Sequence, residues 1–279
     1  MAKSTGKVVA REKVKAKAKG SGQIFVAIIR KEASDQLVLS PMSLRLILLS
    51  TLLFPILNAN AEEESLGALI EARKTAGRAN ASPEKLAAYA DGIKAVEAAE
   101  TVKAAIQQGE KAPDFTLPNA TGMEITLSEK LSEGPVVLVW YRGGWCPYCN
   151  IQLAAYQKIL PQVEELGAQL IAISPELPDK SLSTTEKNGL RFEVLSDVNL
   201  KVSKDYGLVF DLTPEVEKLY GQFFDIKEYN GADAATNQLP LAATYVIAEN
   251  STVAWAFLEA DYTKRAEPRD IIDALDGLE

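Results

Sequence analysis

One stretch constrains the fold of this chain more than any other: an apolar run that passes through a glycine turn into an amphipathic helix. Residues 135–141 (PVVLVWY) form the run, which is typical of a strand buried on both faces of a sheet. Gly143 and Gly144 allow the chain to turn, and apolar residues then recur at helical spacing until Gly167. The stretch therefore predicts a strand, a turn and a helix in succession.

The rest of this region repeats the alternation of strands and helices. We expect strands at 114–117, 123–127, 170–173 and 192–195, helices at 179–189 and 199–206, a hairpin of 244–248 with 253–258, and a last helix at 269–278. Residues 208–238 show no pattern that assigns them to helix or strand. The order predicts an α/β fold with a mixed sheet flanked by helices.

A helical extension precedes this region and spans residues 62–108. Ser82 and Pro83 are typical of a helix start. One apolar stripe follows and ends near Gly109, formed by Leu86, Tyr89, Ile93, Val96, Val102 and Ile106. The stripe could serve docking or oligomerisation, but packing on the helix's own domain is the favoured interpretation. The pattern assigns no oligomeric state.

The first 61 residues look different from everything that follows them. Residues 42–61 combine Arg45, twelve mostly apolar residues at 46–57 and the small-residue site Ala59-Asn60-Ala61. These are the parts of a secretory signal peptide, and the apolar part is too short to span a membrane, which takes about 20 residues. We therefore expect a start at Met42, export to the periplasm or another extracytoplasmic space, and no stable membrane insertion. Residues 1–41 would then be a non-native or disordered basic extension; without a signal peptide the protein would be cytoplasmic.

Composition excludes several kinds of site. The chain has no histidine and two cysteines, so Ser-His-Asp and Cys-His catalysis and His-based zinc or haem sites are excluded. We expect no metal and no cofactor. Residues 1–61 hold ten of the 30 basic and three of the 38 acidic side chains, so the remainder has a net charge of −15. That charge disfavours nucleic acid as a partner.

Both cysteines lie in a Cys-x-x-Cys motif at the start of the predicted helix. The free N–H groups and the positive end of the helix dipole favour a thiolate at Cys146. Arg142 adds positive charge, and Pro147 costs no hydrogen bond in the first turn. Cys149, one turn on, can resolve a disulfide or a sulfenic acid on Cys146. A fixed disulfide or part of a metal site is the alternative, but so small a loop would stabilise the fold little.

The region from Gly109 to Ala274 resembles the peroxiredoxin-like branch of the alkyl hydroperoxide reductase/thiol-specific antioxidant family. The matching segments are APDFTL at 112–117, WYRGGWCPYC at 140–149, ISPE at 173–176, LSD at 195–197, Asp261-Tyr262 and RAEP at 265–268. The resemblance implies a thioredoxin-like fold over residues 109–279. It also implies that Cys146 attacks a hydroperoxide, that Cys149 resolves the product, and that a thioredoxin-like donor reduces the disulfide. Arg142, Trp145 and Pro147 would support the pair.

Three positions depart from the pattern of that family. Gly143 stands where a threonine is usual, Val139 where a proline is usual, and Leu241-Ala242-Ala243 where a distal arginine is usual. Because those groups normally bind the peroxide oxygens and stabilise the thiolate, a second function stays open. A thiol–disulfide oxidoreductase acting on protein disulfides would need only the cysteine pair and access to it. A non-enzymatic scaffold that binds partners through its acidic surface or its helical extension is a third, weaker alternative.

Overall fold

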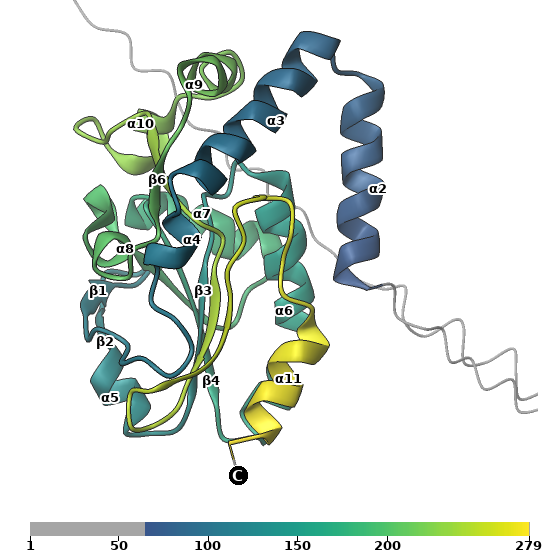
Figure 1. Ribbon diagram of the computed structural model, residues 1–279. Helices are drawn as coiled ribbons and strands as arrows, with labels where there is room; N and C mark the ends of the chain where they lie inside the picture. Colours follow the sequence, from purple (N-terminus) through teal and green to yellow (C-terminus); the bar gives the residue numbers. More distant parts are fainter. Residues whose placement is uncertain (1–64, 279) are drawn as a thin grey trace, which may run out of the picture. The chain divides into compact units, whose positions relative to one another are not determined.

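A mixed sheet forms the centre of the protein in the computed structural model, which describes residues 65–278 (Figure 1). Its five strands lie in the order β5-β4-β3-β8-β9. Strands β3, β4 and β5 are parallel, while β8 and β9 run antiparallel to their neighbours. The strand bounds are β3 Val136–Trp140, β4 Gln169–Ser174, β5 Glu193–Ser196, β8 Thr244–Ile247 and β9 Val253–Phe257. The predicted α/β fold with a thioredoxin-like, helix-flanked mixed sheet is confirmed.

Strand β3 lies in the middle of this sheet and contributes to two hydrophobic cores. All five of its residues are buried, and in a strand successive side chains point to opposite faces. Leu138 and Trp140 therefore enter one core, while Val137 and Val139 enter the other. The second core lies under α6 (Pro147–Glu165) and α11 (Pro268–Asp276). The apolar run was readable in the sequence because neither face of β3 meets solvent.

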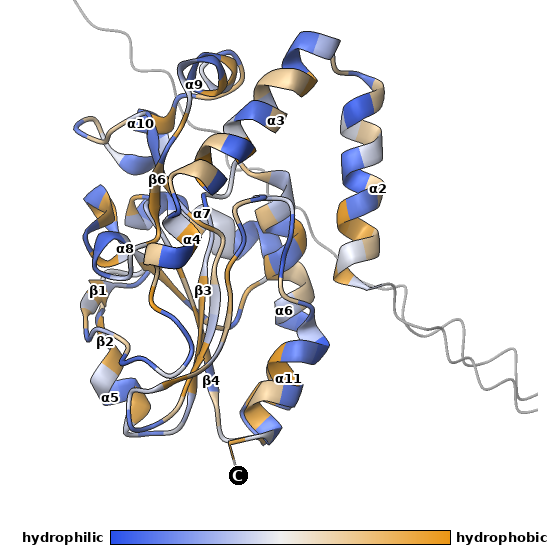
Figure 2. Cartoon of the chain, in the orientation of Figure 1, coloured by the Kyte–Doolittle hydropathy of each residue, from blue (hydrophilic) through white to orange (hydrophobic). Residues whose placement is uncertain are grey.

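The other predicted elements form with small shifts of their ends. They are β1 (Thr116–Pro118), β2 (Glu124–Thr126), α7 (Pro178–Asn188), and the pair η1 (Val198–Leu200) and α8 (Lys201–Asp205). The strand expected at 123–127 stops at Thr126 because Leu127 begins a short helix, α5 (Leu127–Leu131). Figure 2 shows hydrophilic and hydrophobic residues alternating in bands along the outer helices, as surface helices require.

Residues 208–238, which the sequence pattern left unassigned, are structured. They contain β6 (Val209–Asp211), α9 (Pro214–Tyr220), α10 (Ile226–Asn230) and the first residue of β7 (Gln238–Pro240), and β6 pairs with β7 in antiparallel fashion. Each element is shorter than the window over which periodicity can be read. One signal was present: Thr213 caps α9 by accepting a hydrogen bond from the Val216 N–H at 3.4 Å, and Pro214 follows it.

The helical extension consists of α2 (Leu66–Ala79), α3 (Pro83–Ala98) and α4 (Thr101–Ala104). The single helix expected as far as Gly109 is wrong, because Glu100 has a left-handed backbone with φ of 57° and breaks it. Ser82 forms the expected cap, and its hydroxyl accepts a hydrogen bond from the Lys85 N–H at 3.3 Å. Val96 and Leu66 are buried in the two cores. The extension therefore packs on the sheet domain.

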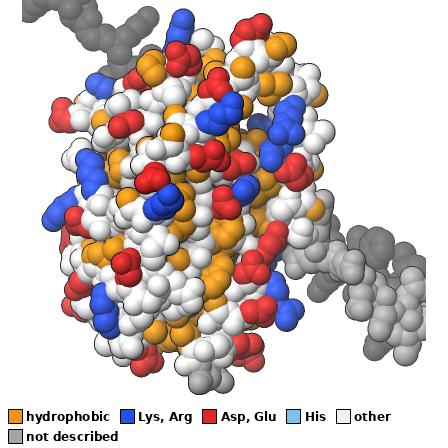
Figure 3. Space-filling view, in the orientation of Figure 1, with side chains coloured by type: hydrophobic (Ala, Val, Ile, Leu, Met, Phe, Trp, Pro, Cys, Tyr) orange, Lys and Arg blue, Asp and Glu red, His pale blue; other side chains and the backbone are white. Residues whose placement is uncertain are grey.

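The expected basic extension at 1–41 and signal peptide at 42–61 lie outside the described residues. Within residues 65–278, no helix combines the length and apolar character needed to cross a bilayer. On the face shown in Figure 3, acidic and basic side chains are interspersed, without a broad basic area.

The carboxylate of Glu267 joins the extension to the rest of the fold. Its two oxygens accept hydrogen bonds from the N–H groups of Leu66 (3.0 Å) and Gly67 (2.7 Å) at the start of α2. We predict that Glu267→Ala lowers the free energy of unfolding by about 1–2 kcal/mol, because it leaves two helix N–H groups without an acceptor. Urea unfolding measures the change, with Glu164→Ala on exposed α6 surface as control. Equal stability of the two variants would contradict the capping role.

Candidate active site

The Cys-x-x-Cys motif lies at the junction of β3 and α6. Cys146 is the residue that precedes the first turn of α6, and Pro147 occupies the first helical position. Gly143 has φ of +148°, and a Cβ there would lie 2.2 Å from the Trp145 indole nitrogen, so only glycine fits. The structure thus places Cys146 and Pro147 where the sequence analysis expects them. Both cysteines are free thiols with no exposed surface.

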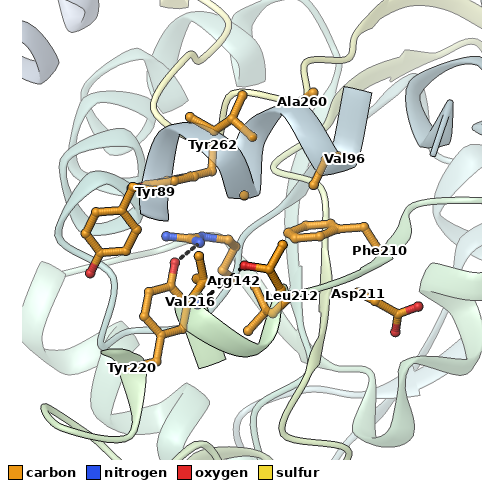
Figure 4. A pocket seen from close by; sticks show the side chains of 13 residues that line it. Tyr89, Val96, Arg142, Phe210, Asp211, Leu212, Val216, Tyr220, Ala260 and Tyr262 are labelled. Carbon is orange, nitrogen blue, oxygen red and sulfur yellow. Dashed lines mark hydrogen bonds between the residues drawn. The ribbon is translucent and has the colours of Figure 1, made fainter. Parts of the chain in front are cut away.

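Arg142 lies against Cys146, as its position in the sequence suggested. Its Nη2 donates a hydrogen bond to the Cys146 Sγ at 3.3 Å, and its Nη1 donates one to the Tyr220 hydroxyl at 2.7 Å. The guanidinium is buried and lies 4.1 Å from the ring centre of Tyr262. In Figure 4 it lies among Tyr89, Tyr220 and Tyr262. Aromatic rings and one phenol thus fix the cation beside the sulfur.

A second arginine contacts the second cysteine. Arg265, in the segment before α11, donates from Nη2 to the Cys149 Sγ at 3.5 Å and from Nε to the Gln152 Oε1 at 2.8 Å. The residue stood in a segment quoted for the family resemblance, but the sequence analysis assigned it no role. Nothing in the local pattern connects it with Cys149, because 116 positions separate the two.

The charges and hydrogen bonds around the two cysteines shift their pKa values in opposite directions. Burial by itself raises the pKa of Cys146, but a hydrogen bond from Cys149 and the positive charges of Arg142 and Arg265 outweigh it and hold that pKa well below the usual range. Burial, the hydrogen bond to Cys146 and the charge of Cys146 hold the pKa of Cys149 well above its usual range. The surroundings therefore favour the thiolate at Cys146 and the neutral thiol, which donates to it, at Cys149.

Glu176 fixes the turn that carries Cys146. One carboxylate oxygen accepts a hydrogen bond from the Gly144 N–H at 2.9 Å, and the other accepts from the Tyr141 hydroxyl at 3.2 Å. The side chain is fully buried, and this burial raises its pKa. A Cβ at Gly144 would lie 2.0 Å from the Thr184 hydroxyl. The turn is therefore held between β4 and α7, an arrangement that no local pattern in the sequence indicated.

Aromatic side chains cover the site. Trp145 stacks on Phe224 with ring centres 4.2 Å apart, and its ring centre lies 5.6 Å from that of Tyr220. Tyr220 belongs to α9, and Phe224 follows that helix. Both come from the segment that the sequence pattern left unassigned, so sequence reasoning missed them. Trp145, expected as a supporting residue, forms part of this aromatic cover.

A cleft opens on the other side of Arg142. Its water-accessible volume is about 20 Å³, and Tyr89, Val96, Phe210, Val216 and Tyr262 contribute to its walls (Figure 4). Arg142 supplies a polar group to a wall that is mostly apolar, and its Nε is buried without a hydrogen-bond partner. Helix α3 of the extension thus helps to shape the surroundings of the site.

The three departures from the family pattern have structural counterparts. Val139 is buried in the second core, and Gly143 has no side chain to offer a hydroxyl. Residues 241–243 are buried and apolar, and the Ala243 carbonyl accepts a hydrogen bond from the Trp140 N–H at 2.8 Å. The polar contacts to the thiols come from Arg142 and Arg265 instead. Among residues 65–278, no cluster of three or more cysteine and acidic side chains could hold a metal ion.

Comparisons with known proteins identify the family to which the chain is similar. The model of the AhpC/TSA family matches residues 108–256. The chain is 31% identical over 112 residues to the chloroplast protein peroxiredoxin Q of Populus jackii, covering 40% of this chain and 52% of that protein. It is 27% identical over 173 residues to peroxiredoxin Q of Gentiana triflora, covering 62% and 66%. The match thus spans about half the length of the first of these relatives.

A solved structure is also similar. The crystal structure of a peroxidoxin from Mycobacterium tuberculosis superposes with a TM-score of 0.49 at 21% identity, covering 62% of this chain and 99% of that one.

Proposed function

The chain belongs to the AhpC/TSA family, and from this premise we propose that it is a thiol-dependent peroxidase that reduces hydroperoxides through Cys146 and Cys149. The observation that carries the proposal is the contact of Arg142 with the buried sulfur of Cys146. A thiolate is the nucleophile that attacks a peroxide, and a guanidinium beside it stabilises that form. The same cation can donate hydrogen bonds to the oxygens of a bound hydroperoxide.

The reaction has two steps on this protein. The Cys146 thiolate attacks the terminal peroxide oxygen, the O–O bond breaks, and the leaving alkoxide or hydroxide takes up a proton. Cys146 is then a sulfenic acid. The Cys149 sulfur attacks the Cys146 sulfur, the S–O bond breaks, and water leaves with the proton that the thiol loses. A thioredoxin-like dithiol, the reductant that the family implies, would restore both thiols by exchange.

The burial of both sulfurs favours a hydroperoxide over a protein disulfide as substrate. Neither cysteine has exposed surface, and the stacked rings of Trp145 and Phe224 cover the turn. A folded protein would have to displace these rings before its disulfide could meet Cys146, and the thioredoxin-like reductant faces the same barrier, whereas a hydroperoxide brings only a small reacting group. Thiol–disulfide exchange on protein substrates is therefore the second candidate.

A stopped-flow experiment tests the proposed function. Reduced protein is mixed with hydrogen peroxide, and free thiols and tryptophan fluorescence are followed, since Trp145 lies next to Cys146. The expected result is a rapid, stoichiometric loss of both thiols. Slow reaction with peroxide combined with rapid reduction of a protein disulfide such as that of insulin would replace the proposal with the second candidate.

Removing Cys149 should stop the cycle after its first step. We predict that Cys149→Ser still reacts with peroxide but accumulates sulfenic acid on Cys146, because no second sulfur is present to expel water. A reagent specific for sulfenic acids, read by mass spectrometry, should label one site per chain. The wild-type protein, treated in the same way, should give little label because its disulfide closes. Absence of label in the variant would contradict the two-step scheme.

A further inference from the structure

We propose that Arg265 is a positioning residue for the second step, holding Cys149 in place and stabilising its thiolate as the disulfide closes. This inference rests on the proposed peroxidase function and deepens it. It gives the site a division of labour in which each cysteine has its own arginine. Arg142 contacts Cys146 at 3.3 Å and Arg265 contacts Cys149 at 3.5 Å.

The geometry around Arg265 leaves its charge available to Cys149. The side chain is only 6% exposed. Its other hydrogen bonds go to neutral acceptors, namely the Gln152 side-chain oxygen and the carbonyls of Tyr262 and Lys264. Within the described part of the chain, no carboxylate forms an ion pair with it. A buried cation without a carboxylate partner is costly, so a thiolate at Cys149, the sulfur in direct contact with Arg265, would supply a counter-charge once Cys146 has lost its own.

The charged groups facing Cys149 change during the cycle. They are the Cys146 thiolate, Arg142 and Arg265. In the reduced protein, burial and the negative charge of Cys146 keep the pKa of Cys149 high, so Cys149 remains a thiol and does not compete for peroxide. Once Cys146 has become a neutral sulfenic acid, its negative charge is gone and both cations remain. Arg265, in direct contact, then favours the thiolate that must attack.

The second step balances on residues of this chain alone. Cys149 loses its thiol proton, its sulfur bonds to the Cys146 sulfur, and the S–O bond of the sulfenic acid breaks. The departing hydroxide takes up a proton and leaves as water. Cys149 is oxidised and the sulfenic sulfur is reduced, so no further oxidant is needed. Arg265 forms no bond in this step; it acts only through Cys149.

The test compares Arg265→Gln with the wild-type protein in a two-step stopped-flow assay with hydrogen peroxide. Sulfenic acid formation should slow less than disulfide closure does, because Arg142 still contacts Cys146, whereas Arg265 acts on Cys146 through its charge alone. Disulfide closure should slow about tenfold at neutral pH, since a hydrogen bond to a charged group is lost. The pH midpoint of the closure step should rise in Arg265→Gln and return towards wild type in Arg265→Lys. Arg269→Gln, which removes an exposed arginine paired with Asp273, is the matched control.

Two further outcomes separate this inference from the proposed function. Closure of Arg265→Gln at the wild-type rate and pH midpoint would overturn the inference and leave the peroxidase intact. If the wild-type protein forms no sulfenic acid, the proposed function fails, and Arg265 is then tested by alkylation of Cys149 in the Cys146→Ser background. There Arg265→Gln should raise the pH midpoint of alkylation, and an unchanged midpoint would overturn the inference.

If Arg265→Gln does not fold, Arg265→Lys carries the test, because losing the guanidinium fork should still slow closure.

Discussion

Cys146→Ser is expected to lose the reaction with hydroperoxide, with a rate reduced about a thousandfold or more. The serine hydroxyl is not ionised at neutral pH, so the charge beside Arg142 disappears together with the nucleophile. Cys149 is not expected to replace it, because burial still raises the pKa of Cys149 and Arg142 contacts position 146 rather than position 149. Stopped-flow measurement of peroxide consumption by the reduced variant gives the residual rate.

The control for this experiment is Cys149→Ser, which keeps Cys146 and should consume one equivalent of peroxide. The two substitutions exchange the same atoms at neighbouring buried positions, so unequal effects report on the roles of the sulfurs rather than on packing. Circular dichroism of both variants verifies the fold. If Cys146→Ser consumed peroxide faster than Cys149→Ser, the attacking role would pass to Cys149, and the assignment of charges made here would be wrong.

The fold could be predicted from the sequence where the signal was local and long enough. The run at 135–141 marked β3 because both faces of that strand are buried, and Ser82 with Pro83 marked the start of α3. The break at Glu100 depends on one left-handed residue that no propensity forecasts. Residues 208–238 form elements of three to seven residues, too short for either period to emerge above chance.

The candidate site likewise has one part that local sequence patterns predict and another that they do not. Arg142, Cys146 and Cys149 lie within eight residues, so one strand–turn–helix unit brings them together and the sequence suffices to propose them. Tyr220 lies 78 positions from Arg142, and Arg265 lies 116 positions from Cys149. These contacts join segments that only the folded structure brings together. Helical and strand periods indicate which face a residue occupies within its element, but not which distant residue meets it. The residues of the motif could therefore be predicted from the sequence, whereas the distant residues that contact them could not.

Arg142→Met is expected to slow the attack on peroxide by about 10- to 100-fold at neutral pH, the scale of one hydrogen bond to a charged group. The substitution keeps much of the side-chain volume among the aromatic rings but removes the donor to Cys146 and the positive charge. Burial, the largest influence on Cys146, then acts with less opposition and raises its pKa. The fraction of thiolate falls, and the donor to the peroxide oxygens is lost as well.

The sign of the pH dependence follows from the direction of that shift. Because the pKa of Cys146 is held below the usual range, the wild-type rate should persist below the ordinary thiol pKa and fall only below the lowered one. In Arg142→Met, the midpoint should move to higher pH. At a pH above the raised midpoint of Arg142→Met the two proteins should differ less, since Cys146 is then ionised in both. Any difference in rate that remains at that pH measures the contribution of Arg142 to binding the peroxide, as distinct from its effect on the pKa of Cys146.

Arg142→Lys, which keeps the charge but not the planar guanidinium fork, should retain the low pH midpoint and lose the contact with Tyr220. A midpoint in Arg142→Met equal to that of wild type would show that Cys149, Arg265 and the helix terminus suffice to hold the thiolate.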